Sequence, residues 1–155
     1  MIVMALIINL GCGLSIYLFL KRKRKQIHER LLHDVVKCSS GVISLTVMMN
    51  LQLLLQMDHS MMFACIFGVI IGVIYGTLER YPLIGNYYEH GFMSGLMGAM
   101  VSIVVLNPSL CGLPAEYGNA LEKNAVTLSF FSSFLAVLTV FVVYYILRGE
   151  FVDKA

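Results

Sequence analysis

Five long apolar segments alternate with short polar stretches along the chain. A helix needs about 20 residues to cross the hydrocarbon layer of a bilayer, because each residue adds about 1.5 Å of rise. Each apolar segment comes close to that length. The predicted spans are residues 2–20, 40–57, 61–78, 88–106 and 126–147. The pattern predicts an all-α, polytopic transmembrane helix bundle that forms a single integral membrane domain over residues 1–155.

All three prolines fall between the predicted spans. Pro82 lies between the third and fourth spans, and Pro108 and Pro114 lie between the fourth and fifth. Since proline ends or kinks a helix, these positions support the span boundaries independently of hydropathy. The fourth span is the weakest crossing, so a four-span arrangement in which this segment is re-entrant stays open.

The segment at residues 26–37 has a mixed character. Leucines and valines alternate there with charged residues and histidines. This pattern is typical of a helix that lies in the membrane interface. We therefore expect a short amphipathic helix at the cytoplasmic surface, before the second span begins.

The composition supports a membrane location. Hydrophobic residues make up 59% of the chain and charged residues 13%, and the mean hydropathy is +0.83. A soluble domain carries about 25% charged residues. Because this chain has too few charges to cover a globule, its apolar surface is expected to face a lipid bilayer.

The basic residues predict the orientation. Residues 21–25 are five consecutive lysines and arginines directly after the first apolar segment. A basic run can bind nucleic acid, but a run in this position is typical of a topology signal that faces the cytoplasm. We expect no nucleic-acid partner. Five spans with the N-terminus outside and the C-terminus inside place this run, Arg80 and Arg148 on the cytoplasmic side.

The first span is expected to be an uncleaved anchor. In a secretory signal the positive charges precede the apolar core, whereas here they follow it. Residues 9–12 (NLGC) offer an alternative, a lipoprotein cleavage box, but the missing charged start argues against it.

Small residues repeat at every fourth position of the third and fourth spans. Residues four apart share one helix face, and in lipid such a face lets two helix backbones approach closely. We expect this glycine zipper to pack the third span on the fourth, or on identical copies, within a homo-oligomer or a larger membrane complex. A pore lined by glycine backbone is the alternative. The predicted packing residues are Gly68, Gly72, Gly76, Gly91, Gly95, Gly98 and Ala99.

No pattern predicts catalysis. No ionisable residue lies at the centre of a span, which argues against an ion-coupled secondary transporter. The chain has no hydrolase elbow, phosphate loop, HExxH motif or Cys–His arrangement. We therefore expect a non-enzymatic protein without catalytic residues.

The short turn between the second and third spans is rich in methionine. Residues 57–62 read MDHSMM. Thioether and imidazole groups suit Cu(I), although methionine also fills space between helices. The string resembles the Met/His tracts of extracytoplasmic copper-handling proteins, which implies copper as a ligand. The candidate metal ligands are Met57, His59, Met61, Met62 and Cys65, with Cys111 as a weaker one.

The fourth span carries a second sulfur-rich pattern. His90, Met93, Met97 and Met100 are spaced so that they share one helix face. A line of thioethers of this kind could pass a soft cation across the membrane.

Residues 91–100 of the same span read GFMSGLMGAM. This string resembles a Gly/Met-rich helix in small bacterial multi-span membrane proteins of uncharacterised activity. The resemblance implies a bacterial plasma (inner) membrane. The sequence as a whole favours a structural or accessory membrane subunit, with a copper-binding or copper-transport protein and a small-solute or ion channel as the alternatives.

Overall fold

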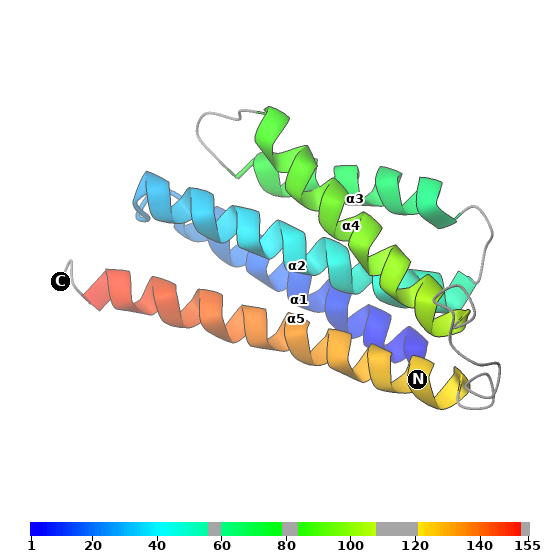
Figure 1. The fold of residues 1–155 in the computed structure, drawn as a ribbon. Helices are drawn as coiled ribbons and strands as arrows, with labels where there is room; N and C mark the ends of the chain where they lie inside the picture. Colours follow the sequence, from blue (N-terminus) through cyan, green and yellow to red (C-terminus); the bar gives the residue numbers. More distant parts are fainter. Residues whose placement is uncertain (56–59, 79–83, 108–120, 153–155) are drawn as a thin grey trace.

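The computed structural model describes residues 1–55, 60–78, 84–107 and 121–152. The predicted all-α class is confirmed, because the described residues form helices and no strand (Figure 1). The five helices are α1 (Ile2–Lys23), α2 (Glu29–Leu55), α3 (Ser60–Gly76), α4 (Ile84–Leu106) and α5 (Leu121–Val152).

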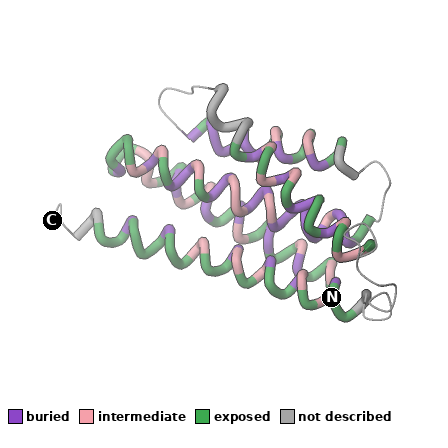
Figure 2. The backbone as a smooth tube through the Cα atoms, viewed as in Figure 1, coloured by how far each residue is buried: buried purple, intermediate pink, exposed green. Residues whose placement is uncertain are grey.

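Helix α2 occupies the centre of the bundle. Helices α1 and α5 pack on one side of it, and α3 and α4 pack together on the other (Figure 1). Successive helices run in opposite directions, so the two chain termini lie at opposite ends of the bundle. Because α2 contacts the other four helices, both its faces are buried, whereas α1 and α5 keep a broad outward face (Figure 2).

Three of the helices are long and apolar enough to cross a membrane: Ile2–Lys23, Glu29–Leu55 and Lys123–Gly149. Helices α3 and α4 contain shorter apolar stretches, Met62–Gly76 and His90–Leu106. Large apolar side chains cover the outward faces of α1, α3, α4 and α5. An exposed apolar surface of this extent is unfavourable in water and favourable among acyl chains.

The amphipathic segment predicted at residues 26–37 is not a separate helix. Most of it forms the first turns of α2, which continues without a break to Leu55. No glycine or proline interrupts the chain between Glu29 and Ser40, and Leu32 and Val36 pack into the same core as the later turns. Helix α2 is longer than a bilayer crossing requires, since 27 residues span about 40 Å and the hydrocarbon of a bilayer is only about 30 Å thick.

Helices α3 and α4 touch through their backbones. A Cβ atom added to Gly68 would lie 2.6 Å from the carbonyl oxygen of Gly91. A Cβ atom added to Gly91 would meet the Gly68 carbonyl and would lie 2.9 Å from Cα of Gly72. Gly95 is similarly confined, because an added Cβ would lie 3.1 Å from the carbonyl oxygen of Ala64. At Gly68 and Gly91 only glycine permits this approach, whereas a side chain at Gly95 would require a small shift of its neighbours.

The same face of α4 also packs against α2. A Cβ atom on Gly98 would meet the carbonyl of Leu45. Ala99 is fully buried in a small cluster with Met48 and Ala64. Gly76 is buried at the end of α3. The small residues of α4 therefore seat that helix between α2 and α3.

We expect Gly91→Ala to lower the free energy of unfolding in detergent by about 1–3 kcal/mol, because the new methyl group would overpack a backbone contact. Gly11→Ala is the matched control, since a Cβ there would have nothing within 4 Å. Unfolding of the purified variants by titration with a denaturing detergent measures both effects. Equal stability of the two variants would contradict a backbone contact between α3 and α4.

Candidate functional site

Polar side chains from three helices meet inside the apolar bundle. Asn9 comes from α1, Thr46 and Asn50 come from α2, and Ser129 and Ser132 come from α5. All five are buried. We call this group the polar cluster. It lies nearer to the end of the bundle that holds the N-terminus (Figure 1).

Hydrogen bonds within the polar cluster connect the three helices. The side-chain nitrogen Nδ2 of Asn50 donates to Oγ of Ser132 at 2.6 Å and to the carbonyl oxygen of Thr46 at 3.0 Å. Nδ2 of Asn9 lies 3.4 Å from the same two acceptors. The hydroxyl of Ser132 in turn donates to the carbonyl oxygen of Ser129 at 2.8 Å. Both asparagines therefore converge on one serine hydroxyl and one backbone carbonyl.

The polar cluster also contains acceptors that no described protein group satisfies. These are Oδ1 of Asn9 and Oδ1 of Asn50, and Oγ of Ser129 is likewise unpartnered. An amide oxygen only accepts hydrogen bonds, and a buried acceptor without a partner costs about 1–3 kcal/mol. Each of these amide oxygens can accept a hydrogen bond from a small donor such as a water molecule.

A cavity of about 250 Å³ adjoins the polar cluster between α1 and α5. Its walls are mostly apolar, and Ser129 and Ser133 are its polar part. The hydroxyl of Ser133 donates to the carbonyl oxygen of Ser129 at 3.0 Å, within its own helix. The lining residues are Met1, Met4, Ala5, Ile8, Val126, Ser129, Phe130 and Ser133.

A second set of polar contacts joins α2 to α4. The hydroxyl of Ser44 donates to the carbonyl oxygen of Gly91 at 2.7 Å. The hydroxyl of Ser102 lies 3.0 Å from the carbonyl oxygens of Met49 and Gly98. Polar side chains therefore connect α2 to both halves of the bundle.

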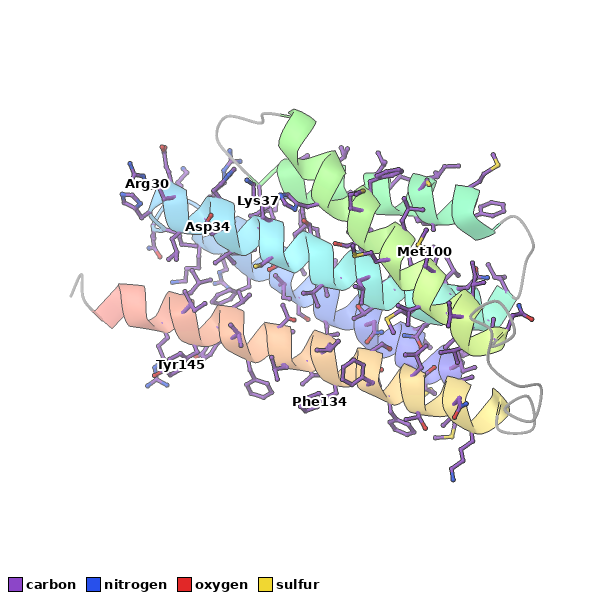
Figure 3. The ribbon with its side chains drawn as sticks, viewed as in Figure 1. Arg30, Asp34, Lys37, Met100, Phe134 and Tyr145 are labelled. Atoms are coloured by element: carbon purple, nitrogen blue, oxygen red, sulfur yellow. The ribbon has the colours of Figure 1, made fainter. Side chains whose placement is uncertain are left out.

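The sulfur-rich stripe of α4 points away from the other helices. His90, Met93, Met97 and Met100 are all exposed, and Figure 3 shows Met100 on the outer side of α4. These residues share one face, but they do not line an interior path within a single chain. A soft cation could follow the stripe only along the outside of the bundle or between two copies.

The predicted copper turn is largely outside the described part of the chain. Met57 and His59 lie outside the described residues, and so does the side chain of Met61. Met62 is exposed, and Cys65 is half-buried on α3. Among the described residues, no three or more His, Cys, Asp or Glu side chains form a group that could hold a metal ion. Copper binding stays a prediction.

The polar cluster was not predicted from the sequence. Asn9 and Asn50 are uncharged amides inside long apolar segments, and a buried amide in lipid needs a partner on a neighbouring helix. An asparagine inside an apolar segment therefore indicates a contact with another helix. The partner, Ser132, is far along the chain from both asparagines, and hydropathy cannot identify it.

Comparison with protein-family models, with curated proteins and with solved structures finds no match to this chain.

We expect Ser132→Ala to lower the free energy of unfolding in detergent by about 1–2 kcal/mol, since both asparagines lose one of their two shared acceptors, the one that links them to α5. Ser133→Ala removes a hydroxyl that bonds only within α5 and should cost less than about 0.5 kcal/mol. The same detergent titration compares the two variants. A loss from Ser133→Ala as large as that from Ser132→Ala would exclude the polar cluster as a link between helices.

Proposed function

We propose that this chain is a non-enzymatic, five-span membrane protein with a structural or accessory role, which pairs with a second copy of itself through α5. The observation that carries this proposal is an outward seam on α5 with the spacing of a helix-pairing surface. The copper-binding and channel alternatives have no comparable support among the described residues.

Five crossings are supported by the alternating direction of the helices (Figure 1). The described basic residues support the orientation. One end of the bundle holds residues 21–25 with Arg30, Lys37 and Arg148, and the other end holds Lys123. Since lysine and arginine concentrate on the cytoplasmic side, we place the N-terminus outside and the C-terminus inside. Residues 91–100 resemble a Gly/Met-rich helix in small bacterial multi-span membrane proteins, which favours the bacterial plasma membrane as the location of this chain.

The seam lies on the face of α5 opposite to its packing face. The packing face is buried against α1 and α2 and includes Ser132, Ala136 and Val143. Phe134 and Tyr145 point away from the bundle (Figure 3). The seam residues follow one another at steps of three, four, three and four, and they are 42% to 79% exposed: Phe131, Phe134, Leu138, Phe141 and Tyr145.

This spacing is the one by which two helices interlock side chains along a left-handed pair. Membrane helices commonly cross at about +20° in this way. The seam contains four aromatic rings and no charge, so it is complementary to itself. Two copies in one membrane share the same orientation, so a two-fold axis along the bilayer normal would place α5 against α5 in parallel.

The rest of the described chain supports a structural role. The buried side chains of Ser44, Asn50 and Ser102 bond to neighbouring helices. The small residues of α3 and α4 bring backbones together. These interactions hold the helices in place and leave the outward faces for contacts with lipid and with another chain.

We expect disulfide cross-linking to trap a dimer through the seam. Each of four positions receives a single cysteine in a background in which the native cysteines are alanine. Phe134→Cys and Phe141→Cys lie in the seam, whereas Val137→Cys and Ile146→Cys are exposed on its two sides. Mild oxidation in native membranes should give several-fold more dimer from the seam positions.

Equal cross-linking at all four positions would show that the copies meet only by random collision in the membrane. That result would contradict pairing through the seam. So would the lack of a dimer at Phe134 and Phe141 when both variants are present in the membrane at normal levels. In either case the seam would face lipid.

A further inference from the structure

Helices α1, α2 and α3 form a groove on a different side of the bundle from the seam. The groove has a volume of about 380 Å³. Ile43 of α2 is buried at its floor, and Leu10, Leu14 and Ile74 are exposed at its rims. It therefore opens sideways. The lining residues are Leu10, Gly13, Leu14, Tyr17, Ile43, Ile71, Ile74 and Tyr75.

Gly13 and Tyr75 give the groove its shape. A Cβ atom on Gly13 would lie 2.9 Å from Cγ2 of Ile43, so the backbone of α1 itself forms part of the floor. The hydroxyl of Tyr75 donates to the carbonyl oxygen of Gly13 at 2.7 Å and fixes α3 against α1. The ring of Tyr75 meets the ring of Tyr17 edge to face, with 6.0 Å between ring centres.

One end of the groove carries a positive charge. Lys21 follows Tyr17 by one helical turn on the same face of α1. Its Nζ atom lies 5.8 Å from the centre of the Tyr17 ring, and the side chain is exposed. The apolar groove therefore leads to an ammonium group at the basic end of the bundle.

The groove is apolar along its length. From Leu10 to Tyr17 the chain rises about 10 Å, and every lining residue is aliphatic, aromatic or glycine. An extended acyl chain suits such a surface, because it has no backbone polar groups to satisfy.

We propose that this groove holds one anionic phospholipid, with an acyl chain against Ile43 and Ile71 and the phosphate at Lys21. Lysines at the cytoplasmic surface attract anionic headgroups. The rims keep the groove in contact with the surrounding lipid, so a phospholipid can enter from the bilayer without crossing a protein layer.

The test is native mass spectrometry of the full chain in detergent, titrated with phosphatidylglycerol or with phosphatidylcholine. The wild type should retain one phosphatidylglycerol in preference to phosphatidylcholine. Lys21→Gln should weaken phosphatidylglycerol binding about five-fold and leave phosphatidylcholine binding unchanged. Lys25→Gln is the matched control, because it removes an equal charge from an exposed lysine of the same basic run.

Filling the groove tests the acyl-chain site. Ile74→Trp and Leu10→Trp change exposed rim residues on opposite walls, so at least one variant should keep its helical content. Either should reduce retention of both lipids several-fold. Equal effects of Lys21→Gln and Lys25→Gln, equal retention of the two lipids by the wild type, or undiminished retention by a folded tryptophan variant would each overturn the proposal.

Discussion

The close approach of α2 to its neighbours is the interaction on which the rest of the bundle depends. Among acyl chains, apolar side chains gain little by leaving lipid for a helix interface, so association rests on dispersion contacts and hydrogen bonds. Helix α2 takes part in both. The backbone of α4 packs closely against α2 at Gly98. The hydroxyl of Ser44 on α2 donates a hydrogen bond to α4, and the side chain of Asn50 donates one to α5. A leucine-lined surface in place of these groups would leave α2 without a preferred neighbour.

This arrangement separates two kinds of surface. Small and uncharged polar residues lie inside beside large apolar ones, and large apolar residues also cover the outside, where a soluble helical bundle carries polar and charged side chains. The outward faces differ in chemistry: α4 presents methionines, α5 presents aromatic rings, and the groove beside α1 leads to a lysine. Because the interior is used for packing, contacts with other molecules fall to these outward faces.

Much of the fold could be predicted from the sequence, because every long apolar run became a helix. The continuation of α2 through residues 29–37 could not be predicted in this way, because a change in polarity along a chain does not show where a helix begins or ends. Repeated glycines predicted close contacts of α3 and α4, but the contact of Gly98 with α2 depends on where three helices meet. The polar cluster joins Asn9 to Ser132 across most of the chain, and the outward direction of Met93 and Met97 depends on which face of α4 is buried.

The central claim is that the apolar outer surface is covered by lipid. Alkaline carbonate extraction of cell membranes, followed by solubilisation of the pellet in mild detergent, tests it most directly. We expect the chain to stay in the membrane pellet after carbonate and to enter solution only with detergent. Release by carbonate into the supernatant as a dispersed, detergent-free monomer would contradict it.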